Sequence, residues 1–101
     1  MKAKIKVGFV GPGYAAWVPN KNTIIIAKPE YATNERLITH ELAHVKQHRE
    51  YGIWFYPTYI LGFIRAGFSY YNNWMEKEAR KAETNPQMRR WARKVIRDNP
   101  L

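Results

Sequence analysis

With 101 residues, the chain is long enough for a single domain, residues 1–101, and leaves no room for a separate binding module beside a catalytic one. Apolar residues make up 46% of the sequence, which is enough for a compact core and excludes a disordered chain despite a formal net charge of +9. The absence of cysteine excludes disulfides, thiolate metal sites and cysteine nucleophiles, so any metal must bind nitrogen and oxygen ligands.

The first elements expected along the chain are two β-strands. Between Ala3 and Val10, lysines alternate with apolar residues at a period of two, which is typical of a half-buried strand. A turn is expected at 11–13. The β-branched run Thr23–Ile26, between the breakers Pro19 and Pro29, predicts a second strand that pairs with the first. Together they predict a small antiparallel or mixed sheet.

The next element is the most clearly marked helix. Thr33 or Asn34 can serve as its N-cap, and Gly52 is a stop signal at its other end. Between them, apolar residues such as Leu42 and Val45 recur at spacings of three and four, which gives the helix one side to bury.

Further helices are expected after Gly52. Their expected ranges are from about 57 to a loop at 67–72, from the cap Asn73 to about 84, and from Asn85–Pro86 to about 97. Strands first and helices later indicate an α+β fold: a small N-terminal sheet followed by the helix 34–51 and two or three more helices.

The sequence predicts a cytoplasmic chain. The lysines near the N-terminus are followed only by the short apolar run Val7–Val10, so no signal-peptide core is present. The longest apolar stretch, Ile53–Ile64, spans about 12 residues and is closed by Arg65, whereas a membrane-spanning helix needs roughly 20. Stable membrane insertion is therefore not expected.

The motif that carries chemistry is His40-Glu41-Leu42-Ala43-His44, an H-E-x-x-H sequence within the helix 34–51. Residues four apart lie on one helical face, one turn apart, so His40 and His44 can bind one metal ion. A catalytic zinc site has three protein ligands of this kind and one open position. Glu41, beside the first histidine, is the candidate general base that takes a proton from the attacking water.

The third ligand is left open by the spacing alone. His48 lies two helical turns beyond His40, about 12 Å along the axis, which is too far for one ion. It is expected to be a surface residue or to support a ligand. Glu76 and Glu78 are the carboxylate candidates, and only one of them can bind the ion because residues two apart point to different faces. Glu76 could instead close a capping box with Asn73.

Two runs of sequence resemble a known family. The run His40–Gln47, followed some thirty residues later by Asn-Asn-x-x-Glu-x-Glu-Ala at Asn72–Ala79, is similar to the gluzincin metallopeptidases. Within these, the chain most resembles the minigluzincins, soluble chains of about this length related to the catalytic domains of membrane metallopeptidases. The resemblance covers roughly 23–84.

The resemblance implies a zinc-dependent peptidase acting on a peptide or protein substrate. It implies zinc bound by His40, His44 and Glu76, with Glu41 as general base. Related membrane enzymes carry Glu-x-x-Ala-Asp, which maps the ligand to Glu76, but here Arg80 replaces the aspartate that orients a histidine. That carboxylate must therefore come from elsewhere if the chain has one.

The family also suggests how the substrate is bound, and the chemistry itself requires a donor to the transition-state oxyanion. Gluzincins pair an edge strand with an extended substrate, and residues 23–27 lie at the matching distance before the helix. Tyr70, Tyr71 and His48 are the candidate donors to the oxyanion, and nothing in the sequence distinguishes among them.

The C-terminal segment 86–101 is strongly basic. In minigluzincins such segments can hold the enzyme latent, which predicts that this segment covers the cleft, within one chain or by exchange in a homodimer, with Asp98 or the Leu101 carboxylate near the metal. Its basic face is also the basis of the alternative function, a non-catalytic module that contacts nucleic acid or an anionic membrane surface. Nucleic acid is the less expected partner, since no nucleic-acid-binding signature is present. A membrane-surface protein would use Ile53–Ile64.

Overall fold

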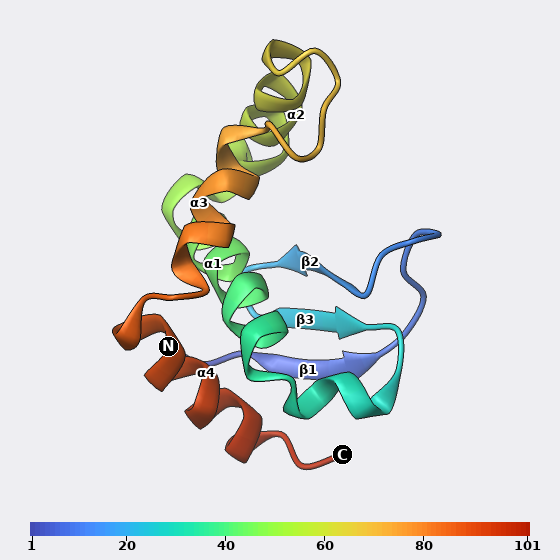
Figure 1. Cartoon of the computed structure of the whole chain (residues 1–101), viewed down its shortest axis with the longest axis vertical. Helices are drawn as coiled ribbons and strands as arrows, with labels where there is room; N and C mark the ends of the chain where they lie inside the picture. Colours follow the sequence, from blue (N-terminus) through green and yellow to red (C-terminus); the bar gives the residue numbers. More distant parts are fainter.

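The computed structural model describes all 101 residues and confirms an α+β fold, in which a three-stranded mixed sheet precedes the helices (Figure 1). Its elements are β1 (Lys4–Val7), β2 (Ala16–Asn20), β3 (Thr23–Ile26), α1 (Glu35–Tyr51), α2 (Phe55–Arg65), α3 (Trp74–Ala82) and α4 (Pro86–Asp98), with short 3₁₀ helices at Pro29–Thr33 and Gly52–Trp54. None of the helices combines the length and the apolar character that crossing a membrane requires.

The sheet has the order β1-β3-β2, with β1 parallel and β2 antiparallel to β3. The sequence did not predict β2, because Pro19 lies within it and lacks an N–H group. Proline is tolerated at the edge of a sheet, and the pairing register of β2 shifts between Trp17 and Asn20, around the proline. The expectation that residues 23–27 form the edge strand is wrong, because β3 is paired on both sides and the edges are β1 and β2.

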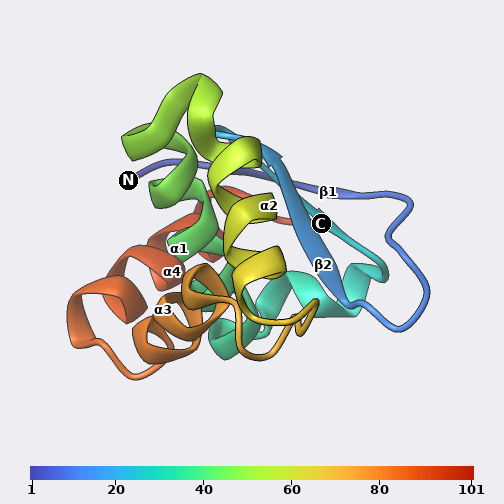
Figure 2. The ribbon, with the colours of Figure 1, turned by 90° about the horizontal axis from the view of Figure 1, so that it is seen from above.

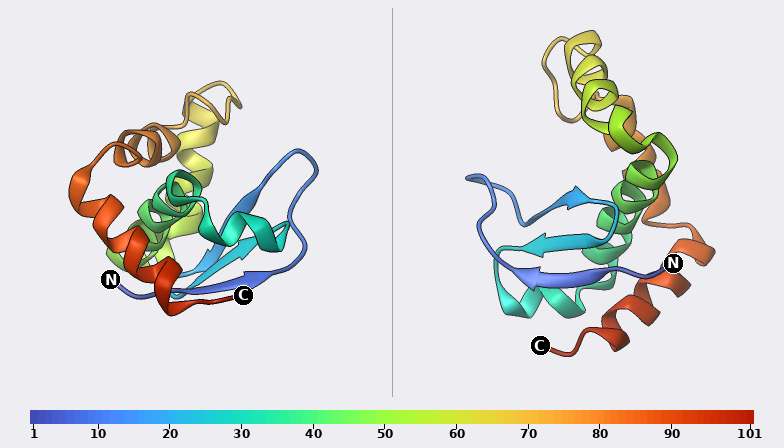
Figure 3. Two further views of the ribbon diagram at one scale, coloured as in Figure 1. Left: turned by 60° about the horizontal axis from the view of Figure 1, so that its bottom comes forward. Right: turned by 180° about the vertical axis from the view of Figure 1, so that it is seen from behind.

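Helix α1 lies between the sheet on one side and α3 and α4 on the other (Figures 1 and 3). The Asn34 side chain accepts a hydrogen bond from the Leu37 amide at 3.1 Å and caps its start, and Gly52, at φ 57°, ends it. Buried apolar residues from all these layers form one core, chiefly Ile24, Ile26, Ile38, Leu42, Val45, Met88, Ala92 and Val95. The core fixes α1 and therefore the histidines it carries.

Helix α3 is tied to α2 through its N-cap residue. The side-chain oxygen of the buried Asn73 accepts from the Met75 amide at 3.0 Å, and its side-chain nitrogen donates to the Tyr59 carbonyl at 3.1 Å. Helix α2 and the start of α3 approach so closely that a Cβ on Gly62 would lie 2.6 Å from the Asn73 side-chain oxygen. This contact sets the position of α3 relative to α2.

The C-terminal segment 86–101 does not cover a cleft within this chain. Helix α4 packs on α1 through Met88, Ala92 and Val95, and the Asn99 side chain hydrogen-bonds the backbone of Ala3, just before β1, and of Ile5, within β1. None of its residues lines either of the two main hollows described below. Asp98 and Leu101 line neither hollow, so the latency role of this segment, including its exchange in a dimer, stays a prediction.

Candidate metal centre

Three predicted ligands converge between α1 and α3. The Nε2 atoms of His40 and His44 lie 3.1 and 3.0 Å from Glu76 Oε1, and the three ligand atoms are all within 4.8 Å of one another. Ligands placed tetrahedrally at about 2.0–2.1 Å from a zinc ion are about 3.3 Å apart, so this spacing is close to that of a bound ion's shell. Glu78, the other carboxylate candidate, does not point here.

The amide of Gln47 determines which nitrogen of His44 carries the proton. Its side-chain nitrogen faces two acceptors at 3.0 Å, the Met75 carbonyl and the Glu78 carboxylate. Its side-chain oxygen is therefore the atom that faces His44 Nδ1, at 2.8 Å, and it must accept a hydrogen bond from the N–H group at that position. The opposite nitrogen, Nε2, then presents its lone pair toward Glu76. Glu78 is thus not a ligand, but it holds the Gln47 amide that orients the ligand His44.

Glu83 fixes the orientation of His40 by accepting a hydrogen bond from its Nδ1, as Gln47 does for His44. Its Oε2 atom lies 2.7 Å from His40 Nδ1, while Oε1 accepts from the Arg36 guanidinium. A carboxylate can only accept at Nδ1, so His40 also presents the lone pair of Nε2 toward Glu76. Burial alone would raise the pKa of Glu83, but the hydrogen bonds from Arg36 and His40 lower it, so it is ionised at neutral pH. Glu83 thus supplies a carboxylate that orients His40, although Arg80 stands where related enzymes have an aspartate for this purpose.

The convergent lone pairs require a positive charge between them. Two imidazole nitrogens and a carboxylate oxygen, all acceptors, lie about 3 Å apart, which is repulsive unless protons or a metal ion bridge them. Burial would lower the pKa of His44, but the hydrogen bond and charge of Glu76 outweigh it and raise this pKa to about 8. The residues therefore fit a divalent cation, and without one they take up protons.

Glu41 is the one buried carboxylate of the site that lacks a complete set of partners. Its side chain is 5% exposed, and Oε2 has no hydrogen-bond partner. Burial raises the pKa of Glu41, and the neighbouring histidines reduce that rise. An unpaired buried oxygen is costly, so its presence beside three convergent ligands points to a function that needs a free acceptor.

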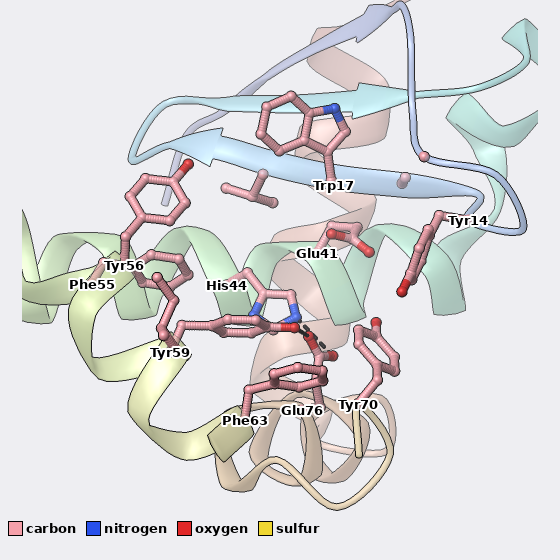
Figure 4. A pocket seen from close by; sticks show the side chains of 14 residues that line it. Tyr14, Trp17, Glu41, His44, Phe55, Tyr56, Tyr59, Phe63, Tyr70 and Glu76 are labelled. Carbon is pink, nitrogen blue, oxygen red and sulfur yellow. Dashed lines mark hydrogen bonds and ion pairs between the residues drawn. The ribbon is translucent and has the colours of Figure 1, made fainter. Parts of the chain in front are cut away.

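Tyr59 of α2 holds the remaining oxygen of Glu76, and sequence reasoning missed it. Its hydroxyl donates to Glu76 Oε2 at 2.6 Å (Figure 4). With Oε2 occupied, only Oε1 of Glu76 faces the histidines. The capping box considered for Glu76 does not form, because both carboxylate oxygens are used within the site and the Asn73 side chain caps the helix through the Met75 amide.

The three residues proposed as oxyanion donors lie in different surroundings. His48 is buried, its Nε2 donates to the Val18 carbonyl at 2.9 Å, and its ring stacks on Phe55, so it is neither a surface residue nor a ligand. Tyr71 is exposed and lies under the Arg80 guanidinium, 3.8 Å from the ring centre. Of the three oxyanion candidates, only Tyr70 lies at the site, where it packs edge-on against Tyr14.

Two hollows share Glu41 in their linings, and Figure 4 shows the first of them. The first, of about 450 Å³, lies between β2, α1 and α2 and is mostly apolar, and the second, of about 700 Å³, reaches Arg36 and Glu83. Besides Glu41, His44 and Glu76, the first is lined by Gly11, Tyr14, Ala16, Trp17, Val18, Phe55, Tyr56, Tyr59, Ile60, Phe63 and Tyr70. The ligand cluster thus opens to a cleft that has the β2 edge as one wall.

Removing the Glu83 carboxylate is expected to weaken metal binding without abolishing it. In Glu83→Ala, His40 loses the partner that fixes its ring, and losses of this kind cost roughly 10- to 100-fold in metal affinity. Competition with a zinc-chelating dye measures the change. Glu50→Ala is the matched control, since Glu50 is exposed and pairs only with Lys46, and its affinity should equal that of the unaltered chain. Equal affinity for both variants would contradict the role of Glu83.

The chain matches no protein-family model, no curated protein and no solved structure. What it does chemically must therefore be argued from the arrangement of these side chains.

Proposed function

We propose that the chain is a zinc-dependent peptidase of the gluzincin type, similar to the minigluzincins. The observation that carries the proposal is the unpartnered, buried Oε2 of Glu41 at the junction of the cleft with three convergent ligands. Two histidines and one glutamate form a donor set that catalytic zinc sites use, and the chain has no thiolate that would favour a structural site.

Each residue has a separate task in this proposal. His40, His44 and Glu76 hold the ion, which when bound acidifies water and polarises the substrate carbonyl. Glu41 accepts a proton from the attacking water and returns it to the leaving amine nitrogen. Tyr70 lines both hollows, and burial raises its pKa, so its hydroxyl keeps its proton and can donate to the oxyanion that develops.

The cleft favours an extended peptide with a bulky apolar side chain. The outer edge of β2 borders the cleft, and backbone pairing with such an edge binds peptides with little sequence preference. Selectivity would come from the first hollow, half of whose lining residues are tyrosine, phenylalanine or tryptophan. A substrate with a leucine or phenylalanine beside the cleaved bond should therefore be hydrolysed faster than one with only glycine or aspartate there.

The proposal is tested by incubating the zinc-supplied chain with casein and with short apolar peptides. Hydrolysis that stops on chelation and returns with zinc is the expected result. If a folded chain holding zinc cleaves none of these substrates, and shortened or dimer-disrupted forms do not either, the peptidase proposal fails. The alternative, a non-catalytic basic module, would rest on the exposed Arg90, Lys94 and Arg97 of α4, since Arg89 and Arg93 share the Glu35 carboxylate.

Zinc binding is expected to release protons in a way that depends on pH. Because the folded, metal-free chain has a His44 pKa of about 8, His44 is largely protonated at pH 7 and must lose that proton to bind an ion. Affinity should therefore rise as pH increases toward about 8 and level off above about 9. Calorimetry in buffers of different ionisation enthalpy counts the protons, and release that is equal at pH 7 and about pH 9 would contradict the shift.

A further inference from the structure

The end of the molecule formed by α2 exposes an unusual amount of apolar surface. Helix α2 and the loop after it project beyond the sheet and α4 (Figure 1), and they face the viewer in Figure 2. Six large apolar residues there are each between 49% and 86% exposed: Ile53, Trp54, Ile60, Leu61, Ile64 and Phe68, called here the α2 tip surface. They lie along α2 and at its two ends, and so many exposed large apolar side chains on one element are typical of an interaction site.

Helix α2 is apolar on its outer as well as its inner face. Phe55 and Gly62 face the protein, as the helical spacing of seven requires, and are buried. The outward positions of the same helix carry Ile60, Leu61 and Ile64, where a helix facing water would carry charged residues. Among the residues of α2, only Thr58 and Arg65 are neither apolar nor aromatic. A helix that is apolar all round is normally covered on both sides, so the outer face of α2 has the character of a docking surface.

The charges around the surface favour an anionic partner over a cationic one, because Arg65 is the only charged residue at 52–75. No aspartate or glutamate occurs at 52–75. Of the carboxylates that flank this stretch, Glu50 is paired with Lys46, Glu76 is held by the histidines and Tyr59, and Glu78 accepts from Gln47. Arg65 ends α2 and is exposed. A second copy of the chain would bring another net charge of +9 to the same contact, which disfavours self-association.

We propose that the α2 tip surface binds peripherally to an anionic lipid bilayer, with α2 lying in the headgroup region. Tryptophan and phenylalanine beside isoleucine and leucine are the side chains that enter this boundary, and the net positive charge adds attraction to anionic headgroups. At 11 residues, α2 is too short to span the hydrocarbon. The inference does not depend on the proposed peptidase activity.

Bilayer binding would place the cleft beside the membrane surface. Tyr56 and Ile60 are both exposed on α2 and part of the lining of the first hollow. Substitutions at these positions would affect lipid binding and the cleft together. Ile53, Trp54 and Ile64 line neither hollow, so they are the positions at which the inference can be tested alone.

The test is co-sedimentation of the full chain with vesicles of phosphatidylglycerol and phosphatidylcholine, compared with vesicles of phosphatidylcholine alone. Binding to the anionic vesicles that weakens with salt is expected. The double variant Ile53→Ser with Trp54→Ser, and separately Ile64→Ser, should weaken this binding, the double variant by at least about tenfold. Phe9→Ser is the matched control, because Phe9 is 85% exposed outside the α2 tip surface, and it should bind like the unaltered chain.

Circular dichroism of each variant checks that it is folded before binding is compared. Absence of binding to anionic vesicles, or equal binding by the double variant and the Phe9→Ser control, overturns the inference. So does a concentration-dependent dimer that the Ile53 and Trp54 substitutions dissolve while vesicles have no effect, since the surface would then belong to a second copy.

Discussion

The chain supplied with zinc is expected to hold about one ion, and Glu76→Ala is expected to lose it. Glu76 Oε1 is the atom on which both histidine nitrogens converge, so its removal leaves two ligands on one helix face and no carboxylate opposite them. Loss of one ligand of three should weaken binding by roughly a hundredfold or more. Metal analysis after gel filtration measures the ratio of zinc to chain.

Thermal unfolding gives a second readout of the same prediction. A ligand that binds only the folded state raises the unfolding temperature, so zinc should stabilise the unaltered chain and have little effect on Glu76→Ala. Glu78→Ala is the matched control on the same helix. It removes one of two acceptors of the Gln47 amide and should keep its zinc, with affinity reduced by about tenfold or less. The ligand assignment fails if Glu78→Ala loses the ion and Glu76→Ala retains it.

The parts of the site that depend on local sequence could be predicted, and those that depend on tertiary packing could not. Helix α1 was predicted because its cap, its apolar spacing and its glycine stop all lie within one segment, and the spacing of His40 and His44 follows from the helix itself. Glu76 was mapped through a resemblance. Its convergence with the histidines requires α3 to pack beside α1, which no local pattern specifies.

Glu83 and Tyr59 illustrate two kinds of missed residue. Glu83 follows Glu76 by seven residues, which is about two helical turns, so the two share a face of the predicted helix 73–84, and this signal could have been used. Tyr59 gave no such signal, because it reaches Glu76 only through the contact of Asn73 and Gly62 between α2 and α3. The edge strand was predicted wrongly for a similar reason. The order of the sheet depends on β2, and Pro19 within β2 removes the sequence pattern of a strand.

Glu41→Gln is expected to lower peptide hydrolysis by roughly 10²- to 10⁴-fold while the zinc content stays unchanged. Glutamine has the shape of glutamate, so the packing around the buried side chain is retained, but its amide cannot accept a proton from water. Glu41 is not among the three convergent ligand residues, so metal analysis should not distinguish the variant. Glu50→Gln, an exposed change on the same helix, should keep full activity. Undiminished hydrolysis by a folded, zinc-loaded Glu41→Gln would remove the general base from the proposal.

The stability of this variant should move in the opposite direction from its activity. Burial raises the pKa of Glu41 above its unfolded value of 4.5, so the folded state favours the neutral carboxyl, and ionisation makes folding less favourable as pH rises through and above that value. The neutral amide removes this cost, so metal-free Glu41→Gln should unfold at a higher temperature than the unaltered metal-free chain at neutral pH, with the difference shrinking below about pH 4. A general base kept free for a substrate carries such a cost, whereas a carboxylate retained for structure would lower stability when replaced. The sign of the shift in unfolding temperature therefore separates the two roles without any measurement of activity.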